Sequence, residues 1–383
     1  KNLSTTHYFK NDREDSKNQK IEDDIDGYNY RVQLVYVEPL LWMHHLQLRY
    51  SYQYKVNNSD RFVYDWNEDL GEFTPDDESA SNQFENQYSN HLLNLAVRTS
   101  RKKYNYNVGV DLEPQKSVSH SLLSDPPEEP LKRSVLNFSP TVNFRYKFSK
   151  RTRLQIVYRG KGRQLNVRDL QPVEDRTNPL NIRIGNPALK PSYTNTFTLN
   201  FNSYHTKRQR NIVASLLVEN TVNSVTNQVT YDSETGVRTT SPVNMNGNWR
   251  ALGSFSLNTP FRNRSWIFRT YSYVQYRNQN GYTTLNREEP MKSTVKHLTA
   301  RERLQLTYRT RQVEITGFAG LLYNNSYNNV GEKRTETYDY QIGTQLQLYL
   351  PWGMELYNDL TYFLRTGYGY EGYAKANFMW NCQ

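Results

Sequence analysis

The chain has 383 residues with 31 Tyr, 15 Phe and 6 Trp, yet its mean hydropathy is −0.88. No run approaches 18 consecutive apolar residues, which excludes a transmembrane helix, and the single cysteine, Cys382, excludes an internal disulfide. The net charge of +10 is interrupted by acidic stretches at 12–26 and 60–85, so no single basic face for nucleic acid is predicted.

Long runs of alternating apolar and polar residues extend through the chain, and each predicts a β-strand with one apolar face. They lie at residues 1–10, 28–38, 44–55, 87–99, 103–114, 134–148, 152–165, 192–205, 211–229, 244–258, 265–277, 298–309, 312–325, 336–350, 353–366 and 373–383. Many are about twice the usual 5–6 residues of a strand in a soluble protein. A strand that crosses a bilayer at a tilt needs about 9–11 residues, so these runs are long enough to cross a membrane.

The hairpin between Glu336 and Leu364 shows the pattern most clearly. Its two runs are joined by the tight turn Pro351-Trp352-Gly353. Successive side chains of a strand point to opposite faces. Leu346 is therefore predicted to face lipid and Gln347 to face the interior.

Short and long links between the predicted strands alternate strictly. The short links lie at 39–43, 100–102, 149–151, 206–210, 259–264, 310–311 and 351–353, and the long ones at 11–27, 56–86, 115–133, 166–191, 230–243, 278–297, 326–335 and 367–372. Outer-membrane barrels have this arrangement, with short periplasmic turns and longer extracellular loops. The sequence therefore predicts an all-β fold: a transmembrane antiparallel up-and-down β-barrel.

We expect a single barrel domain over residues 1–383, with about sixteen strands present of an expected 22. The chain begins without a signal peptide or an initiating Met. The alternation is weak at 1–10, and the last run stops at Gln383 without the usual terminal aromatic residue. These features predict a barrel that is truncated at both ends, without its plug domain, first strands and last strands.

The link at 166–191 contains the most specific motif of the chain, Gly185-Asn186-Pro187-Ala188-Leu189-Lys190-Pro191. It resembles the loop-to-strand signature of TonB-dependent outer-membrane receptors, and the whole chain resembles the tyrosine-rich barrel family common in Bacteroidetes. Ser192 stands where the signature has Glu. The signature residues expected to be structural are Asn178, Pro179, Gly185, Asn186, Pro187, Leu189, Lys190 and Pro191. We expect a stiffened segment that enters a strand, because each residue before a proline is held extended and Gly185 provides a backbone conformation that other residues cannot adopt. Direct contact with a ligand is the alternative.

The resemblance implies active transport of a solute, such as a siderophore, glycan or peptide, across the bacterial outer membrane. Implied partners are outer-membrane lipid, the TonB energising complex acting through the missing plug, and a surface lipoprotein. A passive porin and a soluble extracellular glycan-binding β-protein are the alternative functions.

No enzymatic activity, metal site or cofactor is predicted. The histidines are scattered, and Gly367–Gly372 matches GxGxxG but is followed by a strand rather than a helix, so a dinucleotide site is not expected. Charged residues at alternate positions are predicted to face the interior of the barrel: Arg31, Arg49, Arg98, Arg145, Arg269, Arg303, Asp339 and Asp359. Contact with a plug and a solute pathway are the two roles considered for them.

Overall fold

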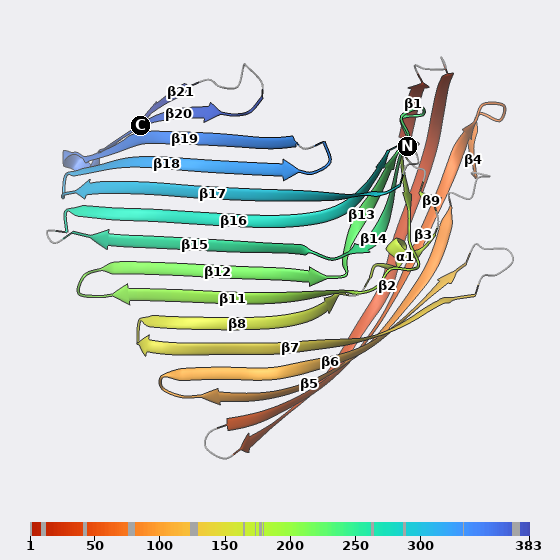
Figure 1. The fold of residues 1–383 in the computed structure, drawn as a ribbon, viewed down its shortest axis with the longest axis horizontal. Helices are drawn as coiled ribbons and strands as arrows, with labels where there is room; N and C mark the ends of the chain where they lie inside the picture. The colour runs from red at the N-terminus through yellow and green to blue at the C-terminus, as the bar shows by residue number, and fades with distance from the viewer. Residues whose placement is uncertain are drawn as a thin grey trace.

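The computed structural model describes residues 2–8, 13–40, 44–75, 81–122, 129–163, 165–172, 174–175, 178, 180–261, 264–285, 289–331, 333–369 and 376–383. Nearly all of them belong to one 21-stranded sheet (Figure 1). The only helical segments among these residues are α1 (Val167–Leu170) and a single 3₁₀ turn at Pro351–Gly353. The predicted all-β class is confirmed.

Sixteen of the strands form one antiparallel ladder in which strands pair in chain order. They are β1 (Asn2–Tyr8), β2 (Arg13–Leu40), β3 (His44–Asn67), β5 (Asn82–Ser100), β6 (Tyr104–Ser121), β7 (Leu131–Ser149), β8 (Thr152–Arg163), β11 (Ser192–His205), β12 (Arg210–Val222), β15 (Asn248–Pro260), β16 (Trp266–Leu285), β17 (Met291–Arg309), β18 (Val313–Asn328), β19 (Lys333–Tyr349), β20 (Glu355–Thr366) and β21 (Asn377–Cys382). Each corresponds to one predicted strand. The up-and-down order is therefore as the alternation indicated.

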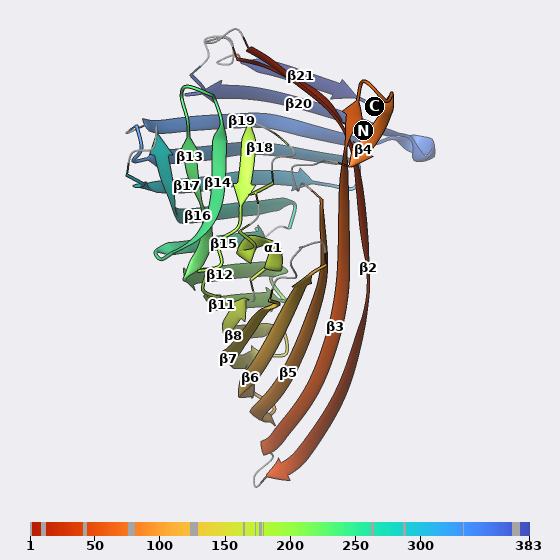
Figure 2. The ribbon, with the colours of Figure 1, turned by 90° about the vertical axis from the view of Figure 1, so that its right-hand side faces the viewer.

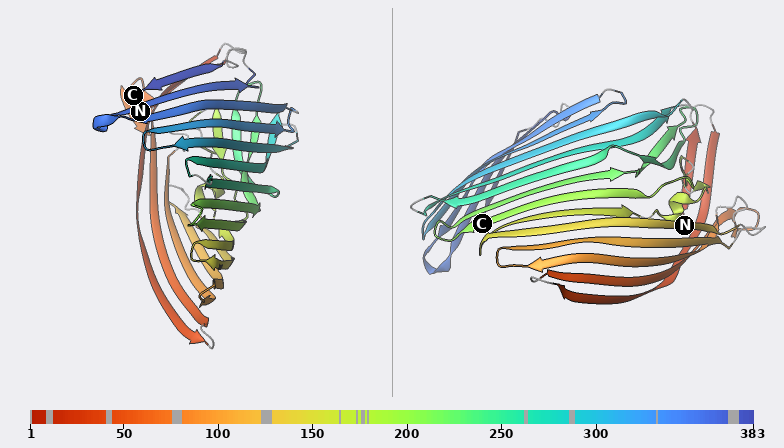
Figure 3. Two further views of the ribbon diagram at one scale, coloured as in Figure 1. Left: turned by 90° about the vertical axis from the view of Figure 1, so that its left-hand side faces the viewer. Right: turned by 60° about the horizontal axis from the view of Figure 1, so that its bottom comes forward.

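The ladder does not close into a barrel. Among the described residues β1 pairs only with β2 and β21 only with β20, so the sheet is an open, curved wall (Figures 2 and 3). The sequence predicted a barrel with more strands than the sixteen of this chain, and these sixteen leave two edges without a partner among the described residues. Closure requires the two edge strands to meet with a matching stagger, a condition that alternation within single strands does not determine.

Several predicted long loops are in fact strand. The link predicted at 11–27 lies mostly in β2, which begins at Arg13, and β3 continues to Asn67 through much of the link at 56–86. The link at 278–297 is likewise filled by the ends of β16 and β17. The extension at 13–27 is polar apart from Ile21 and Ile25, so alternation does not mark it. The extension at 56–67 does contain alternating aromatic residues, Phe62, Tyr64 and Trp66, but the link that contains it is rich in acidic residues, which favour a loop. Their backbone groups are nevertheless paired, as between Asp24 and Asp60.

Five short strands depart from the simple ladder: β4 (Glu72–Pro75), β9 (Glu174–Asp175), β10 (Asn181–Ile184), β13 (Ser224–Tyr231) and β14 (Arg238–Met245). The predicted strand 211–229 is broken at Asn223, whose φ is +50°. Beyond this break β13 pairs with β14 and, in parallel, with the end of β16, while β14 pairs in parallel with β10. A residue in the left-handed conformation turns the chain out of the extended strand, so the single strand predicted at 211–229 is divided into β12 and β13.

The two faces of the wall differ sharply in chemistry. Leu34, Tyr50, Leu93, Leu112 and Phe138 follow one another as directly paired residues on five strands. Their exposed fractions are 67, 42, 47, 36 and 53%. Directly paired residues lie on one face, so this face, called the apolar face below, presents large hydrophobic side chains to the surroundings.

Aromatic pairs border the apolar face at two levels. Trp266 stacks near Tyr308 and Trp249 near Tyr276, each pair with ring centroids 4.9 Å apart. Trp266 and Tyr276 are ten residues apart on β16, or about 33 Å along a strand. A tilt of about 40° reduces this spacing to about 25 Å, the height of the apolar band between the aromatic girdles of a membrane barrel.

Candidate functional site

The second face of the wall is polar, and it carries the predicted interior residues. Arg49 pairs with Asn94, Asn94 with Asp111 and Asp111 with Ser139, so these four side chains share this polar face. The same chain of pairings places all eight predicted residues on it: Arg31, Arg49, Arg98, Arg145, Arg269, Arg303, Asp339 and Asp359.

The carboxylates among these eight residues are bound by neighbouring side chains. Asp359 accepts hydrogen bonds from Gln345 and Thr361, each at 2.8 Å. Asp339 accepts one from the Tyr368 hydroxyl at 2.8 Å and lies 3.9 Å from the Arg365 guanidinium. Both acids are therefore satisfied within their own strands and the adjoining loop.

The arginines are less completely bound. Arg303 packs its guanidinium 5.0 Å from the centre of the Phe318 ring. The Nε atoms of Arg49, Arg145 and Arg303 are buried without a hydrogen-bond partner among the described residues. A buried donor without an acceptor is costly, so these arginines hold unused capacity for an anionic or carbonyl group.

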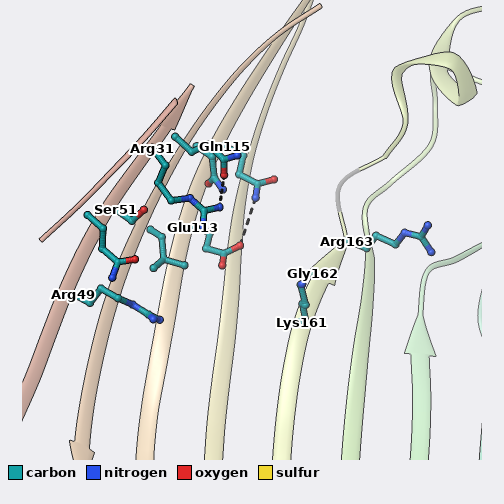
Figure 4. Close-up of a pocket in the computed structure, with 12 residues that line it drawn as sticks. Arg31, Arg49, Ser51, Glu113, Gln115, Lys161, Gly162 and Arg163 are labelled. Carbon is teal, nitrogen blue, oxygen red and sulfur yellow. Dashed lines mark hydrogen bonds between the residues drawn. The ribbon is translucent and has the colours of Figure 1, made fainter. Parts of the chain in front are cut away.

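A pocket of ≈ 430 Å³ opens on the polar face between β2 and β8 (Figure 4). It is lined by Arg31, Gln33, Arg49, Ser51, Gln53, Asn90, Leu92, Glu113, Gln115, Lys161, Gly162 and Arg163. The lining holds four cations and one carboxylate, and it has a single aliphatic side chain. Such a pocket is large enough for a small organic ligand.

The cations of the pocket come from both of its sides. Arg31 donates a hydrogen bond to Gln53 Oε1 at 2.6 Å, and Arg49 lies 3.8 Å from Asp111. From β8, Lys161 lines the same pocket as Glu113. Gln115 donates a weak hydrogen bond of 3.5 Å to Glu113. The cations of the pocket therefore outnumber its acidic groups.

Arg163 lines the pocket but does not point into it. Its side chain is directed away from Arg31 and Glu113 in Figure 4. Arg163 therefore belongs to the rim of the pocket, and Arg31, Arg49 and Lys161 are the other cations of its lining.

The signature segment folds back onto the polar face beside this pocket. Leu189 and Leu170 of α1 are 1 and 3% exposed, and the Arg133 guanidinium donates a hydrogen bond to the Leu189 carbonyl. A smaller hollow between Gln115 and Pro191 separates the segment from the wall. The segment therefore borders the mouth of the pocket.

Asparagine side chains fix the segment through backbone contacts. Asn186 donates to the Pro242 carbonyl at 3.0 Å and accepts from the Ala188 amide at 2.9 Å. Asn244 accepts from the Lys190 amide at 2.6 Å and donates to the Lys190 carbonyl at 2.8 Å. These bonds join the signature to β14, two elements that the sequence did not connect.

The other signature residues have mixed outcomes. Asn178 accepts the Leu180 amide at 3.0 Å, which makes a local turn, whereas Pro179 lies outside the described residues. Pro187 is exposed and Pro191 partly buried. Gly185 is not among the residues that have a positive φ, so a left-handed backbone is not the reason for a glycine there, and its structural role stays a prediction.

Three features of the site were missed in the sequence. Lys161 follows the same alternation as the predicted interior residues and could have been found from it. Asn244 had no distinguishing signal, because its role depends on the fold of a distant segment. Glu302 lies on the apolar face, where it pairs with Leu321 and accepts a hydrogen bond from the Thr270 hydroxyl at 2.5 Å.

Within the described ranges, no three His, Cys, Asp or Glu side chains gather as a metal site. In the same ranges, none of the helical segments has the length and apolar composition needed to span a bilayer.

The sequence model of one family, described as the outer membrane protein beta-barrel family, matches residues 1–381. This range contains the pocket, the signature segment and nearly all of the ladder. No curated protein sequence matches the chain.

Proposed function

The chain belongs to the outer membrane protein β-barrel family, and from this premise we propose that it is the barrel wall of a TonB-dependent receptor. It is a protein of the bacterial outer membrane that crosses the bilayer with many strands. The apolar face contacts lipid tails, and the polar face turns away from them. In the proposed function a solute is taken up actively through the space that the polar face borders.

The observation that carries the proposal is the position of the signature segment. Its resemblance is to receptor sequences, and it folds onto the polar face at the end of the strands opposite the tight turns, where Asn186 and Asn244 fix it. A segment at that end shapes the mouth through which a solute would enter. Tight turns mark the periplasmic side in barrels of this kind, so the mouth faces outward.

The residues of this chain have separate parts in the proposed transport. The paired extensions of β2, β3 and β5 project beyond the apolar band and meet the solute first. Polar-face arginines then bind the solute or pair with a plug, whose movement is driven from the inner membrane. A surface lipoprotein partner would approach the same outer end.

The proposal is tested by measuring solute uptake in cells with and without the energising inner-membrane complex. Cells that make the full-length gene product would be given a mixture of labelled siderophores, oligosaccharides and peptides, and the solute accumulated in the periplasm would be identified by mass spectrometry. We expect accumulation to stop when the energising inner-membrane complex is deleted, with surface abundance of the protein unchanged. Accumulation that continues without the complex would identify a passive porin and overturn the proposal.

A further inference from the structure

The pocket between β2 and β8 lies at a defined level of the wall. Glu113 and Lys161 are each nine residues beyond the first residue of their strands, which begin at the tight turns. Arg31 is nine residues before the end of β2, at the same edge. Nine residues span about 30 Å, reduced by tilt to little more than 20 Å, so the three side chains lie near the outer end of the apolar band.

The electrostatics of the pocket favour one sign of ligand. Arg31, Arg49 and Lys161 line it with one acid, Glu113, and a second acid, Asp111, lies 3.8 Å from Arg49. Lys161 forms no ion pair within 4.0 Å with any residue that the structure describes, and Arg49 retains a buried Nε without a partner. A concave site lined by one sign of charge concentrates ions of the other sign.

The donor types narrow the class of ligand further. Guanidinium groups present parallel N–H donors that match carboxylate and phosphate oxygens, and an ammonium group adds a mobile point charge. Gln33, Gln53 and Asn90 supply neutral donors and acceptors around them. Leu92 is the one aliphatic side chain in the lining, so little binding energy comes from apolar contact.

We infer that this pocket is an outer-mouth binding site for a solute that carries carboxylate or phosphate groups. The inference rests on the proposed function for the orientation of the wall. It names the substrate class, an oxyanion-bearing small molecule, and the residues that recognise it: Arg31, Arg49 and Lys161. Glu113 opposes this binding and limits it to ligands with enough negative charge.

The inference is tested by calorimetry on the protein extracted from outer membranes in detergent. Citrate and inorganic phosphate are the probes, and sucrose is the neutral control. We expect citrate, phosphate or both to bind, with an affinity that falls as sodium chloride is raised. Citrate alone assigns a carboxylate ligand and phosphate alone a phosphate ligand.

Three variants make the test specific. Arg31→Gln with Lys161→Gln should lower the affinity by about tenfold or more, because two charge-assisted contacts are lost. Glu113→Gln should raise the affinity, a change that misfolding cannot imitate. Arg208→Gln, in the exposed turn between β11 and β12, is the matched control and should leave binding unchanged.

Sucrose binding as tight as that of both anions, or anion binding indifferent to the double substitution, would overturn the inference. Its failure is separable from that of the proposed function. If anions bind but uptake does not depend on energy, the transport function is wrong and the binding site stands. If a neutral solute is taken up with energy dependence and anions do not bind, the transport function stands and the binding site is wrong.

Discussion

At the scale of single residues, the face on which a side chain lies decides its environment. Ile342 is 60% exposed on the apolar face, while its neighbour Gln341 lies on the polar face opposite Gly320. The same holds for Leu346 and Gln347, the pair singled out from the sequence. Leu346 pairs with Ile315, and Gln347 donates a hydrogen bond to Glu355 at 3.1 Å.

Ile342→Arg should therefore lower the free energy of unfolding in lipid by roughly 2–4 kcal/mol, because a cation would enter the apolar band. Gln341→Arg should cost far less, since water or polar groups solvate it. Denaturant titration in lipid vesicles, followed by tryptophan fluorescence, measures both. Equal costs would contradict the assignment of the two faces.

Glu302 is the exception on the apolar face. It pairs with Ser272, midway between Trp266 and Tyr276, so its carboxylate lies at the centre of the apolar band. Its contact with Thr270 compensates only partly for the lost hydration.

Glu302→Leu should raise the free energy of unfolding by about 1–2 kcal/mol in the same titration, since acidic groups on the lipid face cost less than Arg or Lys. Glu219→Leu is the matched control. Glu219 lies on the polar face, 3.1 Å from Arg250, and its loss should bring no gain. A decrease in stability for Glu302→Leu would show that the carboxylate has a partner in the membrane.

At the scale of elements, one side chain of β14 bonds to the signature segment at several points. Asn244 bonds the amide and carbonyl of Lys190 and also the Asn223 carbonyl at 2.9 Å. It therefore joins the segment, β14 and the break between β12 and β13. Three such bonds contribute about 1.5–4.5 kcal/mol to local stability.

Asn244→Ala should open the segment without unfolding the wall. We expect faster cleavage within 178–191 by a non-specific protease, with unchanged β-sheet circular dichroism and thermal transition. Asn200→Ala, which removes only a bond to Ser215 on the polar face, is the control. Cleavage at equal rates in both variants would show that other contacts hold the segment.

At the scale of the whole molecule, the open edge of the wall is the dominant feature. All six residues of β21 are exposed, and among the described parts of the chain the strand pairs only with β20. An unpaired edge is a template for another strand. Cys382, a free and exposed cysteine at the end of β21, reports on such pairing.

We expect the 383-residue chain, refolded by itself in detergent, to associate through β21. Mild oxidation should then give a dimer linked through Cys382 on a non-reducing gel, and Cys382→Ser should abolish it. A chain that stays monomeric by light scattering under the same conditions would mean that the edge is covered.

Local patterns in the sequence were enough to predict the all-β class, the sixteen ladder strands, the tight turns and the face on which Arg49 or Asp359 lies. These depend on a two-residue period and on turn residues, which are local properties of the chain. The sequence did not reveal the strand extension at 13–27, because a strand that is polar on both faces has no amphipathic signal. The extension at 56–67 had such a signal in Phe62, Tyr64 and Trp66, but the acidic residues around it favoured a loop.

Contacts between distant segments could be seen only in the folded protein. Arg31 and Lys161 line one pocket although 130 residues separate them, and Asn244 bonds to Lys190 although three strands lie between them in the chain. The curvature of the wall also depends on contacts between distant segments. Register, twist and curvature arise from pairing between strands, so no single strand encodes them.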